Sequence, residues 1–241
     1  MIKLYQFPIS HYCEKVRWAL DYKDIKYTKV NLLPGLHIKQ TKKIGKYSSV
    51  PLLVDGENVL QNSADILTYL DETYPQNSLT PKDESIKAQA LEWEQYVDSE
   101  LGAHVRCVCY HVLLDHPEIV VPFFIHEGPW YGRLFMKFGF KKLQSKMRYF
   151  MKINQQTAQQ SYEKMKQAIH KIAERLETHD FLAGDQFSRA DLAAASLLAP
   201  LCQPKGYGLV WPENTPKELQ DIADEFKQQL EWVHRVYDKY R

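Results

Sequence analysis

The chain has 241 residues, of which 44% are hydrophobic and 25% charged, and this composition is typical of a globular protein with one large domain or two small ones. Its formal net charge of +1 excludes a global attraction to nucleic acid or to an acidic membrane surface. The first residues, MIKLYQFPISHYCEK, lack the sustained apolar run of a secretory signal, and the most apolar later region is interrupted by Pro, His, Glu and Arg. Four cysteines without a regular framework indicate a reducing compartment, and Cys107 and Cys109 have no matching ligand pair elsewhere. We therefore expect a cytoplasmic protein without a membrane span, a nucleic-acid partner or a metal site.

The first seventy-odd residues have the pattern of a mixed α/β unit. The predicted elements, in chain order, are a strand over residues 2–5, a helix over 11–23, a strand over 25–33, a basic connection over 35–49 with one irregular helix, a hairpin around Asp55-Gly56 and a helix over 63–74 that Pro75 ends. The hairpin signal is strong because glycine tolerates the positive φ that such turns require. The order β-α-β-α-β-β-α predicts a parallel crossover with an antiparallel hairpin added at its edge.

Nearly everything after the linker-like stretch PQNSLTPKDES is helical in pattern. The predicted helices cover residues 85–114 as one long helix, 155–179, 188–201 and, as one or two helices, 216–240. Ser188 and Asp191 form a capping-box pattern, for which we expect a structural role. The resulting domain prediction is an α/β domain over residues 1–76, a linker over 77–84 and an all-helical domain over 85–241, with an aromatic-rich segment at about 117–150.

The stretch PISHYCEKVR places a hydroxyl and a thiol three residues apart, at Ser10 and Cys13, where a strand is expected to turn into a helix. Three interpretations fit: a redox motif without its first cysteine, a nucleophile site, or a helix cap. His11 follows Ser10, and because adjacent side chains of a helix do not face each other, we expect it to be exposed at the helix start.

Four motifs, occurring in this order and at this spacing, carry a resemblance to a known family. They are PISHYCEKVR, SVPLL, LQNSADILTYL and FLAGDQFSRADLAAAS. With them the chain resembles the cytosolic glutathione S-transferase superfamily over nearly its whole length, in particular its bacterial-like Ser/Cys types. The first stretch is also similar to glutaredoxin-related prostaglandin E synthases. The resemblance implies a thioredoxin-like domain followed by an all-helical domain, with glutathione as co-substrate.

The resemblance implies roles for three residues around the sulfur of glutathione. Ser10 stands where Ser-type transferases keep their catalytic hydroxyl, which would donate a hydrogen bond to the sulfur and, with the helix N-terminus, stabilise the thiolate. Pro51 resembles the family's cis-proline, and the residue before it, Val50, would pair its backbone with the cysteinyl part of glutathione.

Four further residues are implied for the two carboxylates of glutathione. Asn62 and Ser63 match the family's pair at a helix start that receives the γ-glutamyl carboxylate, and we expect Ser63 to cap that helix. His37 and Lys39 lie in the basic connection, where the family often uses a basic residue against the glycyl carboxylate.

The implied function is a glutathione transferase that joins the thiolate to a hydrophobic electrophile, with peroxidase activity from the same sulfur, in a homodimer. Two alternatives stay open. Cys13 would serve a glutathione-dependent thiol–disulfide oxidoreductase or isomerase. A non-catalytic binding module would need no thiol-peptide site, and the presence of a full set of site residues argues against it.

In the helical half the second substrate is expected near the first long helix. One face of that helix carries Glu100, His104, Cys107 and His111, and another carries Arg106 and Tyr110. Spacing alone leaves open which face is turned to the thiol. The aromatic segment at 117–150 fits a pocket roof, a dimer interface or ordinary core.

Overall fold

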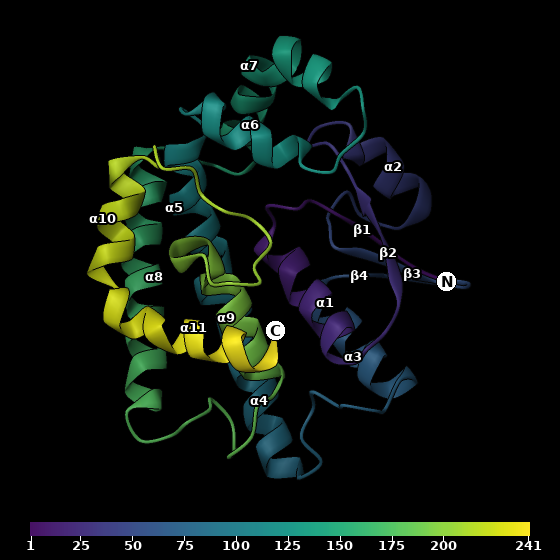
Figure 1. The fold of residues 1–241 in the computed structure, drawn as a ribbon, viewed down its shortest axis with the longest axis vertical. Helices are drawn as coiled ribbons and strands as arrows, with labels where there is room; N and C mark the ends of the chain where they lie inside the picture. Colours follow the sequence, from purple (N-terminus) through teal and green to yellow (C-terminus); the bar gives the residue numbers. More distant parts are fainter.

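The computed structural model describes residues 1–241 and consists of an α/β half followed by a helical half (Figure 1). The elements of the first half are β1 (Ile2–Gln6), α1 (His11–Tyr22), β2 (Tyr27–Asn31), α2 (His37–Ile44), β3 (Leu52–Asp55), β4 (Asn58–Gln61) and α3 (Ser63–Thr73). The strands lie in the order β2-β1-β3-β4. β1 pairs in parallel with β2, whereas β3 is antiparallel to both β1 and β4. The predicted βαβαββα order and mixed sheet are confirmed.

Local sequence explains where these elements begin and end. In β1 the alternate residues Ile2, Leu4 and Gln6 are buried, as expected for a strand with one face on a core. Gly56 adopts a φ of 58° in the turn between β3 and β4, a conformation that favours glycine. α3 ends before Pro75, which cannot continue a helix.

The second half contains only helices. They are α4 (Glu84–Tyr96), a π-helical turn (Val97–Gly102), α5 (Ala103–Leu113), α6 (Pro117–Ile125), α7 (Gly132–Phe150), α8 (Gln155–Leu176), α9 (Arg189–Cys202), α10 (Lys217–Glu225) and α11 (Lys227–Tyr240). The helix predicted over 85–114 is a continuous rod, but the π-helical turn lies in its middle, and such turns are frequent at functional sites. None of these helices combines the length and the apolarity needed to cross a bilayer. The domain boundaries given above stay a prediction.

Helix α9 forms the centre of the molecule. Twelve of its fourteen residues are buried, and it contacts α1, α4, α11 and the π-helical turn. The small residues of the run 193–195 let these neighbours approach closely. Ser188 and Asp191 form the predicted capping box, and Asp191 also accepts a hydrogen bond of 2.8 Å from the Leu182 N–H. The structural role expected for this motif is confirmed.

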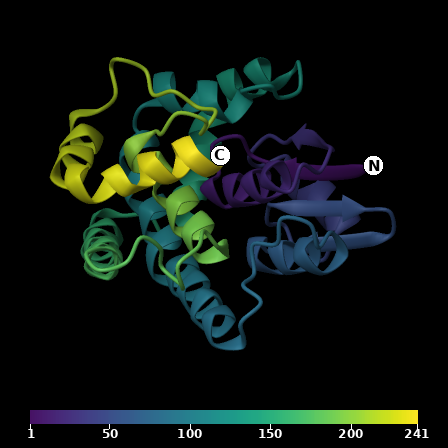
Figure 2. The ribbon, with the colours of Figure 1, turned by 60° about the horizontal axis from the view of Figure 1, so that its bottom comes forward.

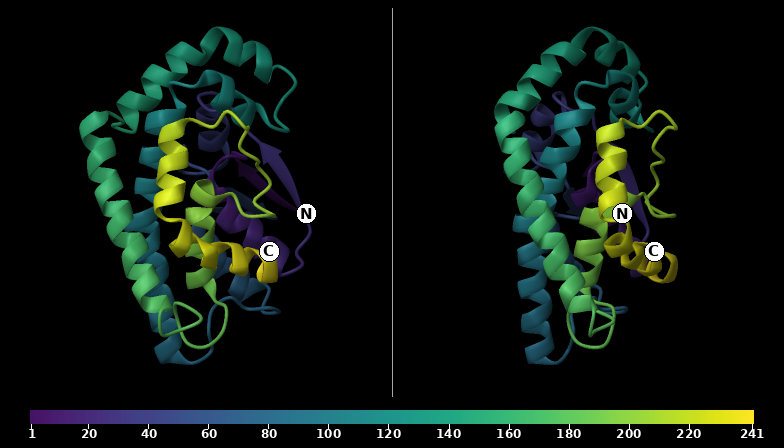
Figure 3. Two further views of the ribbon diagram at one scale, coloured as in Figure 1. Left: turned by 60° about the vertical axis from the view of Figure 1, so that its left-hand side comes forward. Right: turned by 90° about the vertical axis from the view of Figure 1, so that its left-hand side faces the viewer.

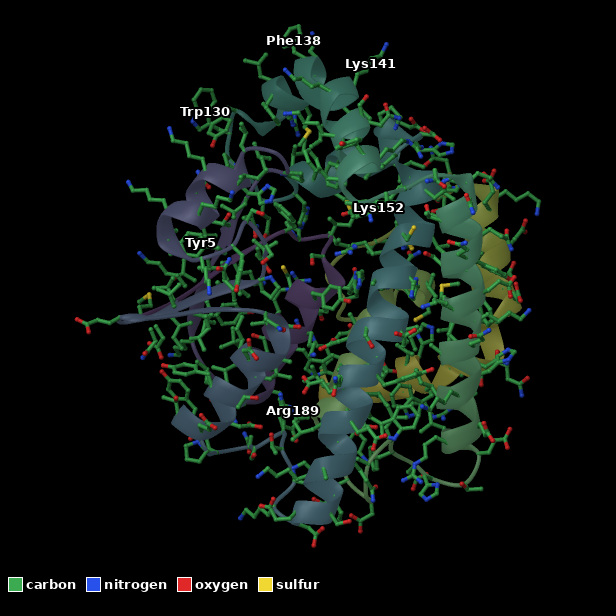
Figure 4. All side chains as sticks on the ribbon, turned by 180° about the vertical axis from the view of Figure 1, so that it is seen from behind. Tyr5, Trp130, Phe138, Lys141, Lys152 and Arg189 are labelled. Atoms are coloured by element: carbon green, nitrogen blue, oxygen red, sulfur yellow. The ribbon has the colours of Figure 1, made fainter.

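Buried charges connect the two halves. The Lys15 ammonium of α1 lies 2.8 Å from Glu94 and 2.7 Å from Asp98. Arg189 of α9 contacts the same Glu94 at 2.6 Å and donates to the Ala64 carbonyl of α3 at 3.0 Å. Figure 4 shows Arg189 between the halves. Because each charge has an oppositely charged partner, this junction avoids most of the cost of burying ions.

The last helix returns to α1, as Figure 2 shows at the C-terminus. Arg241 lies 2.8 Å from Glu14 and 2.6 Å from Asp21. The Trp18 indole donates to the Tyr240 carbonyl at 2.8 Å. Helix α1 is therefore held by both ends of the helical half.

The segment at 117–150 forms α6 and α7, which extend over one end of the α5–α8 layer (Figure 3). Its aromatic residues divide into two sets. Phe123, Phe124 and Phe140 are buried and belong to the core. Trp130 and Phe138, together with others described below, are exposed. The interpretation of this segment as ordinary hydrophobic core is therefore correct for only part of it.

Candidate functional site

Ser10, the first residue of the candidate site along the chain, lies in the turn between β1 and α1. Ser10 is the N-cap of α1, and its Oγ accepts a hydrogen bond of 3.3 Å from the Cys13 N–H. A hydroxyl can accept and donate at the same time. The Ser10 hydroxyl also lies beside the buried Cys13 sulfur, so it can donate its proton either to that sulfur or to a ligand at the positive end of α1.

Cys13 lies one turn further on and is fully buried. Burial raises the pKa of its thiol, although the Arg17 charge and the bond from Ser10 oppose this shift. A reactive cysteine requires a lowered pKa and access to solvent. The surroundings of Cys13 therefore weigh against the redox interpretation and favour a core residue.

The expectation that His11 is exposed was wrong. The ring is buried, and its Nε2–H donates to the Gly102 carbonyl at 3.0 Å. Burial, with a smaller contribution from the Arg106 charge, lowers the pKa of His11 to about 3. The π-helical turn covers the first turn of α1, a contact between residues far apart in the chain. The imidazole is thus a neutral link between the site and the helical half.

The segment before β3 has backbone groups that are available to pair with an extended peptide. The Val50-Pro51 bond is cis, as the resemblance implies. Neither the N–H nor the carbonyl of Val50 makes a hydrogen bond within the chain. Gln61, which the sequence did not single out, fixes the approach to Val50: its amide donates to the carbonyls of Tyr47 and Ser49 at 2.9 and 3.0 Å. An unpaired backbone held in place can pair with another strand.

The start of α3 differs in one detail from the prediction. Asn62, and not Ser63, is the N-cap: its Oδ1 accepts from the Ala64 N–H at 3.1 Å, and its φ is 88°. Ser63 is the first helical residue, because the backbone enters the helix one position earlier than the spacing suggested. The hydroxyl and the N–H of Ser63 make no hydrogen bond within the chain, which leaves them for an anion at this helix end.

His37 and Lys39 lie on different faces of α2. His37 begins the helix, its ring packs edge-on against Phe7 with centroids 4.7 Å apart, and its Nδ1 accepts from the Gly35 N–H. Burial lowers the pKa of His37. Lys39 is exposed, makes no ion pair and lies roughly opposite His37 by helical spacing. The packing against Phe7, close to Ser10 in the chain, favours His37 over Lys39.

The structure also separates the two faces of α5. The face with His104 and Cys107 is turned to α8, where His104 lies 3.1 Å from the Ser161 hydroxyl and the Cys107 thiol contacts the Thr157 carbonyl. This face of α5 therefore packs on α8.

The π-helical turn before α5 meets α1. A Cβ on Gly102 would lie 2.5 Å from the Tyr12 hydroxyl, which itself donates to the Asp98 carbonyl at 2.7 Å. Arg106 follows Gly102 by one turn, is exposed and has no ion pair. Its charge acts on both Tyr12 and Tyr110, where it opposes the rise in pKa that burial causes. Arg106 is thus an unpaired cation beside the start of α1. This position follows from the contact between the π-helical turn and α1 and could not be predicted from the sequence.

The fold is that of a thioredoxin-like domain joined to a helical domain. The profile described as glutathione S-transferase, N-terminal domain, matches residues 4–78, and the profile described as glutathione S-transferase, C-terminal domain, matches residues 133–217. The chain belongs to the glutathione S-transferase superfamily.

Curated relatives agree with this assignment. Glutathione S-transferase Z2 of Arabidopsis thaliana is 36% identical over 117 residues, which cover 47% of this chain and 52% of that protein. The zeta-class glutathione S-transferase of Euphorbia esula is 39% identical over 103 residues, or 42% and 46% of the two chains. The chain thus spans about half the length of the curated relatives it matches.

Two solved structures are similar in fold over almost their full length. Beta-etherase LigF of Sphingobium sp. strain SYK-6 has a TM-score of 0.66 at 20% identity, and the match covers 97% of this chain and 98% of that one. A glutathione S-transferase of Methylobacillus flagellatus with bound glutathione has a TM-score of 0.63 at 19% identity, covering 99% and 93%. At these identities the likeness concerns the fold alone.

Proposed function

We propose that this protein is a glutathione transferase in which Ser10 activates the glutathione thiol for attack on a hydrophobic electrophile. The hydroxyl donates a hydrogen bond to the sulfur, so the thiolate and not the thiol is the bound form. The thiolate then forms the new carbon–sulfur bond, and the leaving group departs with its electron pair. An organic hydroperoxide would meet the same sulfur, so peroxidase activity is part of the proposal. A cytoplasmic homodimer is part of the proposal.

The observation that carries this proposal is the position of the Ser10 hydroxyl at the N-terminus of α1, where a ligand thiolate would compete with the neutral, buried Cys13 thiol for its proton. A thiol titrates near pH ~8.5, and lowering its pKa by about two units requires about 2.7 kcal/mol. A hydrogen bond to a charged group contributes roughly 1.5–3 kcal/mol, and a helix N-terminus adds about 0.3–1 kcal/mol. The two effects together are sufficient.

The remaining contacts fit the rest of the tripeptide. The unpaired backbone of Val50 supports pairing with the cysteinyl unit, and the free N–H and hydroxyl of Ser63 support binding of the γ-glutamyl carboxylate. Asn62 then acts by capping α3 and fixing this helix end. His37 is the preferred candidate for the glycyl carboxylate. Arg106 and Tyr110 border the side on which the electrophile would enter.

The two alternatives have less support. A disulfide mechanism at Cys13 requires a thiolate at a side chain that is fully buried and whose pKa is raised. A pure binding module gives no reason for the unpaired groups of Val50 and Ser63 to occur together with a hydroxyl at Ser10.

The test is an ultraviolet difference titration of the thiolate against pH, with and without glutathione, on the wild type and on Ser10→Ala. We expect the pKa of the bound thiol to lie about two units below that of free glutathione and to return most of the way in Ser10→Ala, with a roughly 10- to 100-fold loss of conjugation rate. Ser10→Thr keeps a hydroxyl and should retain a lowered pKa.

Two controls separate chemistry from folding. Asp83→Ala removes the N-cap of α4 far from the site, so it reproduces a cap loss of about 1 kcal/mol without touching the sulfur. Cys13→Ala should leave the thiol pKa and the rate nearly unchanged. Saturable binding with an unshifted thiol would contradict the role of Ser10, and loss of activity in Cys13→Ala alone would move the chemistry to that residue.

A further inference from the structure

Large apolar side chains are concentrated in solvent on one part of the surface, at and around α7. Twelve large hydrophobic residues of the chain are exposed, and five of them lie between residues 130 and 150. Trp130 is 91% exposed and Phe138 is 77% exposed. The five are Trp130, Leu134, Phe138, Tyr149 and Phe150. Scattered apolar residues are ordinary on a surface, but such a concentration marks an interaction site.

The exposed residues of α7 form one stripe. Met136, Phe140 and Leu143 are buried and define the inner face of the helix. Leu134, Phe138 and Lys141 follow one another at spacings of four and three and therefore share the outer face. Figure 4 shows Trp130, Phe138 and Lys141 projecting outward at the same end of the molecule.

This stripe carries a strong positive charge. Residues 130–152 contain seven cationic residues and no Asp or Glu, whereas the whole chain has a net charge of only +1. The rest of the chain is therefore net acidic. Only Arg148 has an ion-pair partner, Asp115 at 2.7 Å. The unpaired cations are Arg133, Lys137, Lys141, Lys142, Lys146 and Lys152.

A hollow of about 1000 Å³ lies between α6 and α7, next to the stripe. Its lining includes apolar residues of both helices, such as Val121, Ile125 and Phe140. Lys137 and Lys141 of the stripe line it as well. The lining also holds Glu118 and Glu127 against the cations Arg133, Lys137 and Lys141, so the charges of the hollow sum to a positive value. A net basic hollow with apolar walls suits a molecule with an anionic head and a hydrocarbon tail.

We propose that this basic-aromatic face, defined by Trp130, Leu134, Phe138, Lys137 and Lys141, docks the protein on the surface of a bilayer that contains anionic lipids. Aromatic and leucine side chains would enter the headgroup region, and the lysines would meet the negative surface potential. The proposal is independent of the transferase activity proposed above.

Two other occupants fit the observations less well. A second copy of the chain that met this face through the same face would bring two sets of unpaired cations together, at a cost in repulsion. A single-stranded nucleic acid would use the cations and the aromatic rings, but it leaves Leu134 and the apolar hollow without a role.

The experiment is vesicle co-sedimentation of the full chain at low salt, with vesicles of phosphatidylcholine alone and of phosphatidylcholine mixed with phosphatidylglycerol. We expect binding to the anionic vesicles, little binding to the neutral ones, and release at high salt because the electrostatic part is screened. The fluorescence of Trp130, isolated by comparison with Trp130→Phe, should shift to the blue on binding as the indole leaves water.

Two sets of variants test the face itself. The triple change Lys137→Glu, Lys141→Glu, Lys142→Glu should weaken partition to the anionic vesicles by a factor on the order of 100, since each surface lysine contributes about fivefold. The matched control is Lys3→Glu, Lys26→Glu, Lys29→Glu, which reverses three exposed, unpaired lysines on the α/β half and should bind nearly as the wild type. Phe138→Ala should weaken binding several-fold, and Val210→Ala, an equally exposed apolar residue elsewhere, should not.

Four results would overturn the proposal. They are equal binding to both kinds of vesicle, an equal loss in the control triple variant, a dimer that dissociates when Phe138 is changed, and tighter binding of single-stranded RNA than of anionic vesicles. The third result would assign the face to a second copy of the chain, and the fourth to nucleic acid.

Discussion

The junction between the two halves and the outer face of α7 use cations in opposite ways. At the junction Lys15 and Arg189 are buried, and both contact Glu94 within 3 Å. On α7 the lysines are exposed and, apart from the paired Arg148, the cations have no acidic partner. Paired and buried charges hold one geometry, whereas unpaired and exposed charges are available to a partner. The net charge of +1 for the whole chain gives no indication of either arrangement.

The largest effect is expected at Glu94. Glu94→Ala leaves Lys15 and Arg189 buried without this shared acid, and breaking a buried pair in this way costs about 3–5 kcal/mol. The free energy of unfolding, measured by urea denaturation, should fall by that amount. Glu84→Ala, which removes an exposed partner of Lys87, should change it by less than about 1 kcal/mol. Equal effects of the two variants would remove the contrast between buried and exposed charge.

An intermediate effect is expected at His11 and depends on pH. The pKa of His11 falls from 6.5 to about 3 in the folded protein, so the folded state binds fewer protons than the unfolded state between these values. Stability contributed by neutral His11 is therefore complete above pH ~6.5 and is lost as the pH falls, by about 2 kcal/mol at pH ~5. His11→Gln keeps a donor for the Gly102 carbonyl and should lack this acid sensitivity.

The check is a series of denaturation curves at several pH values for the wild type and His11→Gln. His126→Gln, a change at an exposed histidine, should retain the acid sensitivity of the wild type. If the wild type and His11→Gln lost stability in parallel on acidification, the buried neutral imidazole would not be the cause.

The smallest effect is expected on α7. Lys141 lies four residues after Lys137, and like charges at this spacing destabilise a helix by about 0.2–0.5 kcal/mol. Lys141→Glu should therefore leave the unfolding free energy unchanged or raise it by less than about 1 kcal/mol, as thermal denaturation can show. A marked destabilisation would mean that Lys141 stabilises the fold, as the buried cations of the junction do.

The sequence predicts best what depends on neighbours in the chain. The hairpin at Gly56, the capping box at Ser188 and the order of strands and helices follow from local preferences, and all three are confirmed. The Val50-Pro51 bond is cis as expected, although its role toward glutathione stays a prediction.

Features that depend on distant contacts were not predictable from spacing. His11 is buried because the π-helical turn, about ninety residues later, covers it. The turn itself falls inside a stretch that reads as one regular helix. The cap of α3 moved by one residue, from Ser63 to Asn62, since Asn62 adopts a positive φ that no pattern of hydrophobic residues encodes. The position of Arg106 beside α1 depends on the same interface.

Gly102 has no side chain, and this allows α1 and the helical half to pack closely at this position. Its missing side chain lets the Tyr12 hydroxyl and Leu197 come within 3 Å of the position that a Cβ would occupy. A methyl group there would clash with these atoms and push α1 away from the helical half. The spacing between α1 and the π-helical turn thus depends on one absent carbon atom. Changing the size of this residue offers a way to adjust how closely α1 packs on the helical half without altering Ser10 itself.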